Sequence, residues 1–122
     1  MKMTYQTGLA GEQIAAAWLN KNAGMTLLAS RVRTKAGEID LIMTDGETVV
    51  FVEVKTRLGG RPGDGLMAVD RKKQQRIARA ATLWLMGRGW LNRQARFDVT
   101  EVTGERVIHI PNAFQPGGMF FG

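Results

Sequence analysis

The sequence feature that most restricts the fold is the stretch Val49–Lys55, which reads VVFVEVK. It is β-branched and aromatic and contains no Gly or Pro, which predicts a strand near the centre of a sheet. Successive side chains of a strand point to opposite faces, so Phe51, Glu53 and Lys55 share one face. Unpaired charges in a core cost several kcal/mol each. Glu53 and Lys55 must therefore pair with each other, reach water at a cleft, or hold a metal.

A second strand pattern precedes this one over residues 37–43. Asp45-Gly46 lies between the two apolar runs, and Asp-Gly in that position is a strong signal for a two-residue hairpin turn. With that turn, Asp40 faces Phe51 and shares the sheet face of Glu53, at a diagonal spacing of about 7–8 Å. Two carboxylates at that spacing can hold one ion together. The same register pairs Thr44 with Glu47 and Glu38 with Glu53.

Length and charge limit the class of protein. The 122 residues suffice for one domain with one core, so we expect a single domain over 1–122, with a core at 8–102 and a Gly/Pro/Phe-rich tail at 111–122. The absence of Cys excludes disulfides, and the single His109 excludes a multi-histidine zinc site. No apolar run reaches transmembrane length and no signal-peptide core is present, which favours a cytoplasmic protein without a membrane partner. The net charge of +6 favours nucleic acid as the partner.

Residues 7–23 predict a first helix, with Thr7 as N-cap and Gly24 just past its end. Glu12 lies at the edge of the apolar side of this helix. One interpretation is that Glu12 complements the helix dipole in the first turn. The other is that it points towards the predicted hairpin.

Asp70 is the predicted N-cap of a second helix that runs to about Met86 and stops at Gly87 and Gly89. Lys73 falls on the apolar stripe of this helix, so it should point inward near the helix start. A separate basic stripe is either a solvated face or a phosphate-binding surface; it consists of Lys72, Arg76 and Arg79. The apolar stripe consists of Ile77, Ala80, Ala81 and Trp84.

The remaining segments predict three strands, at residues 25–33, 96–102 and 106–110, and a loop at 56–69. Basic residues that are either solvated or in contact with phosphate are Arg31, Arg33 and Lys35 at the end of the first strand, and Arg57 and Arg61 in the loop. We expect His109 to face solvent, Asp98 to form a structural salt bridge or lie on the surface, and Trp90 and Leu91 to pack against the sheet. The tail aromatics Phe114, Phe120 and Phe121 are open to packing, base stacking or disorder.

These residues fit metal-assisted phosphodiester cleavage. Asp40 and Glu53 supply the carboxylates that suit Mg²⁺, and the backbone carbonyl of Val54 lies between the two site residues of its strand as a third ligand. Lys55 can orient the attacking water or neutralise charge on the phosphate. Glu12 can complete the outer sphere of the ion, and Lys73 can grip the scissile phosphate.

Asp40, followed across a hairpin by Glu53-Val54-Lys55, resembles the pattern of the PD-(D/E)XK nuclease superfamily. A longer ordered set of motifs resembles the bacterial YraN-type proteins and covers residues 8–102: Gly8-x-x-Gly11-Glu12, Gly37-Glu38-Ile39-Asp40-Leu41-Ile42, Phe51-Val52-Glu53-Val54-Lys55-Thr56-Arg57, Lys72-Lys73-Gln74-Gln75-Arg76-Ile77 and Arg96-Phe97-Asp98-Val99.

The resemblance implies an α/β fold with a restriction-endonuclease-like αβββαβ core, in which two helices flank a mixed central sheet. It also implies similarity to archaeal Holliday junction resolvases, in which a Glu of the first helix joins the Asp, Glu and Lys of the site. That set maps onto Glu12, Asp40, Glu53 and Lys55. The implied activity is endonucleolytic cleavage of DNA, branched or structured, with Mg²⁺ or Mn²⁺. Because such resolvases act as dimers, a homodimer is a further implication.

Two other functions remain open from the residues alone. One is a non-catalytic nucleic-acid-binding module that keeps the nuclease fold and binds without a metal. The other is a protein-interaction subunit of a larger machine that uses the Phe-rich tail.

Overall fold

In the computed structural model the chain forms two helices and five strands, described over residues 5–57, 69–104 and 106–115. The elements are α1 (Tyr5–Ala23), β1 (Thr26–Thr34), β2 (Gly37–Asp45), β3 (Thr48–Arg57), α3 (Arg71–Arg88), β4 (Ala95–Thr103) and β5 (Arg106–Phe114). The strands make one sheet in the order β1-β2-β3-β4-β5. The predicted central position of the Val49–Lys55 strand is therefore confirmed.

The sheet is mixed, because β3 pairs in parallel with β4 and all other neighbours pair antiparallel. Parallel neighbours need a long crossover, and α3 lies within the connection from β3 to β4. The predicted α/β class, with an αβββαβ order and two helices flanking a mixed sheet, is confirmed. One further strand, β5, adds to this core at the edge beside β4.

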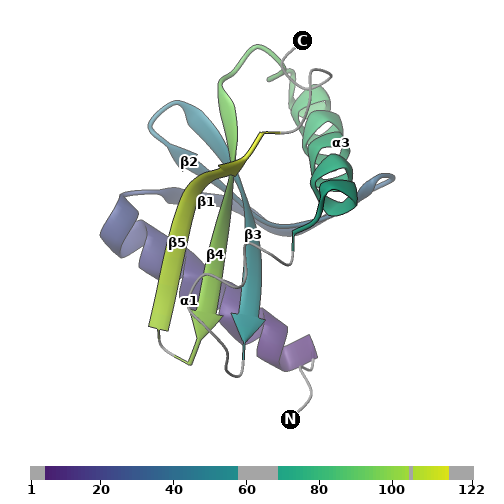
Figure 1. The fold of residues 1–122 in the computed structure, drawn as a ribbon. Coiled ribbons are helices and arrows are strands. Elements are labelled where there is room, and N and C mark those ends of the chain that lie inside the picture. The colour runs from purple at the N-terminus through teal and green to yellow at the C-terminus, as the bar shows by residue number, and fades with distance from the viewer. Residues whose placement is uncertain (1–4, 58–68, 105, 116–122) are drawn as a thin grey trace.

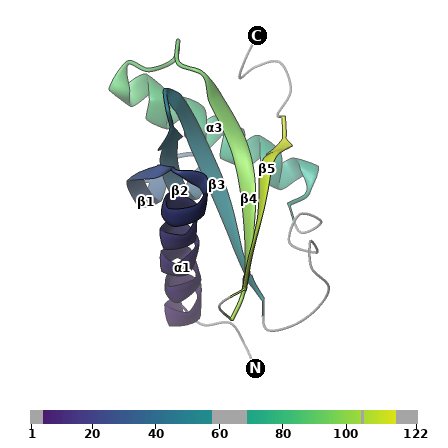
Figure 2. The same cartoon turned by 90° about the vertical axis from the view of Figure 1, so that its left-hand side faces the viewer.

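The helices cover opposite faces of the sheet (Figures 1 and 2). Each face has its own core, because alternate side chains of β3 point to different helices. Val50 and Val52 pack in the core under α1, together with Leu19. Val49 and Phe51 pack in the core under α3. Glu53 follows Phe51 on the α3 face, so the charged end of the strand lies beneath that helix.

The turn between β2 and β3 differs from the predicted one. Asp45 pairs with Thr48, so Gly46 and Glu47 form the turn and Asp45 belongs to β2. Gly46 supplies the positive φ of +59° that the tight turn requires. The predicted pairs of Asp40 with Phe51, Thr44 with Glu47 and Glu38 with Glu53 are therefore wrong.

The difference in register would by itself leave the predicted sheet face of Asp40 unchanged. Ile42 lies opposite Phe51, two positions along β2 from the predicted partner. A shift of two residues preserves the face of every side chain, whereas a shift of one would reverse it. However, Ile39 and Ile42 both pack in the core under α3, so β2 does not alternate strictly between them and this count does not fix the face of Asp40.

The helix ends confirm most of the predicted signals. Asp70 caps α3, and its side chain accepts a hydrogen bond of 2.8 Å from the Lys73 N–H. α3 continues through Gly87 to Arg88 and ends at Gly89, where φ is +70°. Gly24 follows α1 with φ +69°, as predicted. Thr7 is not the N-cap, because α1 already begins at Tyr5.

Three further predictions near the C-terminus need correction or refinement. β5 continues past Ile110 to Phe114, with Pro111 tolerated because β5 is an edge strand with an irregular register. Phe114 packs in the core under α3, while Phe120 and Phe121 lie outside the described residues. Trp90 packs against that core as predicted, but Leu91 is 57% exposed and does not pack against the sheet.

Candidate active site

The candidate site lies where β2 and β3 stop pairing. Their ladder ends with Leu41 opposite Val52, although both strands continue beyond that pair. There the Oδ2 atom of Asp40 accepts a hydrogen bond of 2.8 Å from the backbone N–H of Val54. The Asp40 carboxylate thus accepts the hydrogen bond that a backbone carbonyl of β2 would accept if the ladder continued. We call the point where the two strands part, marked by this bond, the β2–β3 fork.

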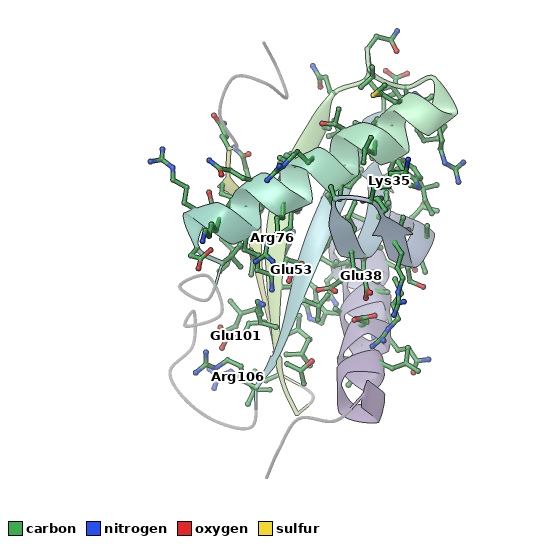
Figure 3. All side chains as sticks on the ribbon, turned by 90° about the vertical axis from the view of Figure 1, so that its right-hand side faces the viewer. Lys35, Glu38, Glu53, Arg76, Glu101 and Arg106 are labelled. Carbon is green, nitrogen blue, oxygen red and sulfur yellow. The ribbon has the colours of Figure 1, made fainter. Side chains whose placement is uncertain are left out.

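Glu53 forms the centre of a charged cluster under α3. It is 6% exposed, and its Oε1 atom lies 2.7 Å from Lys73 Nζ and 3.4 Å from Lys55 Nζ. Lys73 comes from the first turn of α3, which the Asp70 cap fixes in place. Figure 3 shows Glu53 on the strand beneath the N-terminal half of α3, close to the labelled Arg76. The predicted inward direction of Lys73 is confirmed, and it joins α3 to the charged end of β3.

Asp40 has a strongly perturbed acidity. Burial and, after it, repulsion from the Glu53 carboxylate raise the pKa of Asp40 to about 8. The hydrogen bond from the Val54 N–H favours the charged form, but its effect is smaller. A carboxyl group shifted this far prefers to hold a proton at neutral pH. Asp40 is therefore mostly neutral at pH 7, whereas Glu53 has two lysines beside it.

The two lysines differ in acidity. Burial, together with a hydrogen bond to Lys73, lowers the pKa of Lys55. Burial also opposes the charge of Lys73, but hydrogen bonds to Glu53 and Lys55 outweigh it and raise the pKa of that group. Lys73 is therefore the lasting positive charge of the pair, and Lys55 is the one that exchanges a proton more readily.

Glu12 reaches the site from α1, on the other face of the sheet. It is 8% exposed, and its Oε1 atom lies 2.8 Å from Arg31 Nε on β1. Burial raises the pKa of Glu12 in spite of Arg31, and the charges of Glu38 and Glu53 add to this effect. The alternative role at the helix dipole is wrong, because α1 begins at Tyr5 and Glu12 lies beyond its first turn.

Close contact between α1 and β3 holds Glu12 in this position. A Cβ atom added to Gly11 would collide with the Oγ1 atom of Thr56 on β3. Only Gly allows the helix backbone to approach the strand this closely. Gly11 thus allows α1 to pack closely on β3, and the next residue, Glu12, carries the charged group.

Comparison with known families adds to this geometry. A profile described as "Uncharacterised protein family UPF0102" matches residues 11–102. The chain belongs to this family. UPF0102 proteins similar to it come from Anaeromyxobacter dehalogenans, 45% identical over 91% of this chain and 85% of the relative, and from Serratia proteamaculans, 44% identical over 86% of this chain and 92% of the relative. Another, from Klebsiella pneumoniae, is 41% identical over 93% of this chain and 89% of the relative.

The UPF0102 match confirms the YraN-type resemblance read from the motifs. The matched region begins at Gly11 beside Glu12 and ends in β4 at Val102. It therefore contains Asp40, Glu53 and Lys73, and it leaves out β5. The part of the UPF0102 chain that carries the charged cluster is the part that defines the family.

The structure describes most, but not all, of the residues predicted to contact nucleic acid. Lys72, Arg76 and Arg79 are exposed on α3, as a solvated or phosphate-binding stripe requires. Arg57 ends β3 and is partly buried, while Arg61 lies outside the described residues. Arg31 pairs with Glu12 at 2.8 Å, and its side chain is 25% exposed.

One charged residue beside the cluster was not among the sequence-predicted site residues. Glu101 on β4 lies opposite Lys55 in the β3–β4 register and is 3% exposed. Figure 3 shows Glu101 on the face of the sheet below α3. Its alternation with Phe97 and Val99 was visible in the sequence, but its partner strand was not.

A second polar network lies on the α1 face, and it is structural. Asp98 is fully buried and accepts hydrogen bonds from Arg96 Nε at 3.0 Å and from the Asn112 N–H at 2.9 Å. Its Oδ2 atom lies 2.7 Å from His109 Nε2. Burial opposes the charge of Asp98, but bonds to His109, Arg96 and Asn112 outweigh it and lower its pKa. The structural salt bridge predicted for Asp98 is confirmed.

His109 does not face solvent, contrary to the prediction. It lies opposite Thr100 in the β4–β5 register, so it shares the α1 face with Asp98. Its ring also packs edge-on against Trp18 of α1, at 6.1 Å between centroids. Alternation along β5 alone could not show which face α1 covers.

Two further findings on the described residues concern metal binding and membrane-spanning helices. Among them, no three or more Asp, Glu, His or Cys side chains are grouped closely enough to hold a metal ion. A metal here would need backbone, water or substrate oxygen besides the carboxylates of Asp40 and Glu53. No helix in the described ranges has the length and apolar character needed to cross a membrane.

Proposed function

We propose that this UPF0102 protein is a metal-dependent endonuclease that hydrolyses phosphodiester bonds in DNA, with branched or structured DNA as its substrate class. The observation that carries the proposal is the pair of carboxylates at the β2–β3 fork. Burial and the charge of nearby Glu53 raise the pKa of Asp40 to about 8, and two lysines lie beside Glu53. Strongly perturbed acids grouped with cations are concentrated at functional sites.

The donor set suits Mg²⁺ or Mn²⁺. Mg²⁺ binds through one or two carboxylates and completes its shell with water and substrate phosphate. Asp40 and Glu53 would supply the carboxylates. The N–H and C=O of one strand residue point to the same side, so the Val54 carbonyl faces the side on which Val54 meets Asp40. When bound, such a cation activates a water molecule and neutralises charge on the phosphate.

The other side chains of the cluster have distinct tasks in this proposal. Lys73 keeps its positive charge and contacts a phosphate oxygen near the scissile bond. Lys55, with its lowered pKa, orients the attacking water and exchanges a proton with it. Glu12 adds negative charge at the outer edge of the site. The phosphate backbone of the DNA follows the basic residues of α3 and the end of β3: Lys72, Arg76, Arg79, Arg57 and, outside the described residues, Arg61.

A cleavage panel tests this proposal. Purified protein is incubated with branched, single-stranded and duplex DNA, each with Mg²⁺, with Mn²⁺ and with a chelator. We expect cleavage only with a metal ion, and a loss of about a hundredfold or more in Asp40→Asn and in Lys55→Gln. Glu38→Gln is the matched control, since Glu38 is an exposed acid on the same strand as Asp40. Cleavage that survives both site variants, or no cleavage of any substrate, would contradict the proposal.

One observation favours a second candidate, a nucleic-acid-binding module without catalysis. Glu53 already has Lys73 at 2.7 Å and Lys55 at 3.4 Å, so two ammonium groups occupy the surroundings of one proposed ligand. That module would bind DNA equally well with and without Mg²⁺. Its affinity would fall with salt, with a log–log slope of about −0.9 per phosphate contact on duplex DNA.

A further inference from the structure

A cluster of aromatic rings and guanidinium groups lies at the C-terminal end of α3, away from the candidate site. We call it the Trp90 cluster; its members are Trp84, Arg88, Trp90 and Arg93. The guanidinium carbon of Arg93 lies 3.9 Å from the centre of the Trp90 ring, and that of Arg88 lies 4.5 Å from Trp84 and 5.5 Å from Trp90. Cation–π contacts of this kind hold a guanidinium flat against the ring.

The Trp90 cluster is rigidly attached to the protein core. Gly89 reverses the chain in the left-handed conformation, and the Trp90 N–H then donates a 2.9 Å hydrogen bond to the Leu85 carbonyl. The Trp90 ring packs edge-on against Trp84 at 5.6 Å, and Trp84 packs edge-on against the core residue Phe51 at 6.1 Å. The planes of the cluster are therefore held in place before any ligand binds.

The surroundings of the cluster are exposed, basic and apolar, with no acid nearby in sequence. Arg88 and Arg93 are exposed, and the two Trp residues are half-buried. No Asp or Glu occurs between Asp70 and Asp98. Three large apolar side chains are exposed close by in sequence: Leu83 at 41%, Met86 at 55% and Leu91 at 57%. A surface that combines flat cations with apolar area fits a partner that is both planar and negatively charged.

We propose that the Trp90 cluster binds unpaired nucleobases of a single-stranded DNA segment. The guanidinium group of Arg93 lies over the Trp90 ring and Arg93 is exposed, so the outer face of this group is available to stack on a base. The exposed stripe of α3 connects the cluster to the candidate site, since Lys72, Arg76, Arg79, Leu83 and Met86 follow one another at helical spacing. Bases need to be unpaired for this contact, because the bases of a duplex are stacked on one another.

The length of α3 determines how many nucleotides of single strand can reach from the candidate site to the Trp90 cluster. Arg88 lies fifteen residues after Lys73, or about 22 Å along the helix axis. A fully stacked strand advances about 3.4 Å per nucleotide, so a strand that reaches from the site to the cluster spans at most about six or seven nucleotides, and fewer where the strand is extended. This part of the inference rests on the proposed function, since it takes Lys73 as the position of the scissile phosphate. It makes single-stranded extensions or unpaired arms the feature that the enzyme selects.

The test uses DNA binding in the presence of a chelator, so that it is independent of cleavage. Fluorescence anisotropy of the full-length protein compares a labelled single strand with a blunt duplex of the same sequence. Arg93→Lys keeps the charge and removes the planar stacking surface. Arg106→Lys is the matched control, because Arg106 is an exposed Arg of β5 that lies outside the proposed DNA contacts. We expect Arg93→Lys to weaken single-strand binding about tenfold, and to change duplex binding by less than about twofold.

A second measurement checks the span. Binding of a single strand of about ten nucleotides is expected to depend on Arg93, whereas a strand of about four nucleotides bound at the site is expected not to.

Quenching of Trp fluorescence by the longer strand, lost in Trp90→Phe, would support direct base contact. An RNA strand of the same sequence tells which sugar the cluster accepts, and tighter RNA binding would overturn its assignment to DNA.

Other results would overturn the proposal. Equal weakening of single-strand and duplex binding by Arg93→Lys would reduce Arg93 to a phosphate contact. The absence of any DNA binding at low salt, together with concentration-dependent self-association relieved by Leu91→Lys, would assign the surface to a protein contact instead. If single-strand binding depends on Arg93 but the protein cleaves no DNA, the proposal for the Trp90 cluster stands and only the proposed nuclease activity is contradicted.

Discussion

The Asp40 carboxyl group is subject to two opposed influences. The hydrogen bond from the Val54 N–H favours the carboxylate, while burial and Glu53 favour the acid, and the second pair prevails. The sequence was sufficient to predict that Asp40 lies near Glu53, whose charge acts on it, although the predicted hairpin register was wrong by two residues. It could not predict the pKa, because that depends on where β2 and β3 stop pairing.

Replacement of Asp40 by Asn is expected to flatten the pH dependence of stability. Between about pH 4 and pH 8 the folded state holds the Asp40 proton and the unfolded chain does not, so the free energy of unfolding falls as pH rises through that window. The fall is at most about 1.4 kcal/mol per pH unit. Urea unfolding of both proteins with a chelator, at pH 5 and pH 8, measures the difference. A variant that is clearly less stable than the parent at pH 8 would assign Asp40 a structural role.

Asp98 is expected to behave in the opposite way. It is fully buried and charged, so Asp98→Asn leaves Arg96 without its main partner and should cost about 3 kcal/mol or more. Because its pKa is lowered, this stability is present above the unfolded value of about 4 and is lost as pH falls through the folded one. Glu38→Gln, which breaks the exposed pair with Arg33, should change stability by less than about 1 kcal/mol. Equal costs in the two variants would show that the network adds little.

At the scale of elements, local signals predicted the strands and helices better than the turns. The Asp45-Gly46 pair is a strong turn signal, yet Asp45 belongs to β2 and its Oδ2 atom lies 2.9 Å from Arg96 Nη1 on β4. A contact between strands that are distant in sequence thus accompanies the different turn. The register of β5 was unpredictable for a similar reason, since it depends on the Asn112 N–H and His109 meeting Asp98.

The contact between α1 and β3 gives a prediction at this scale. Gly11→Ala places a Cβ atom against Thr56 Oγ1, so the helix must shift and stability should fall by about 1–3 kcal/mol. Gly87→Ala is the matched control. It lies within α3 with no atom within 4 Å of the added Cβ, and it should gain about 0.5–1 kcal/mol. Thermal unfolding measures both variants. Addition of Thr56→Ala should recover part of the loss in Gly11→Ala, and no recovery would place the strain elsewhere.

At the scale of the whole molecule, charge is distributed unevenly over the two faces of the sheet. The Asp98 network is enclosed on the α1 side, whereas exposed basic residues follow α3 on the other side. The sequence was sufficient to predict this basic stripe from helical spacing. It could not predict the Trp90 cluster, because the cluster needs the chain reversal at Gly89 to bring Trp90 back to Trp84.

Salt dependence measures how many of these charges meet DNA. If Lys72, Arg76 and Arg79 each contact one phosphate, their combined replacement by Gln should reduce the log–log salt slope of duplex binding by about 2.7. The residues are exposed, so the fold should be unaffected. Binding isotherms at several salt concentrations give the slope. An unchanged slope would mean that the stripe is a solvated face and that DNA binds elsewhere.

The bond that marks the β2–β3 fork also makes the site observable by NMR without any attached probe or substrate. The Val54 amide proton points at Asp40, so its NMR resonance should move when that carboxyl group gains or loses a proton, or when a cation binds to it. Titration with acid or with Mg²⁺ can then be followed at one backbone signal. This protein therefore contains its own indicator of what occupies the space between its two acids.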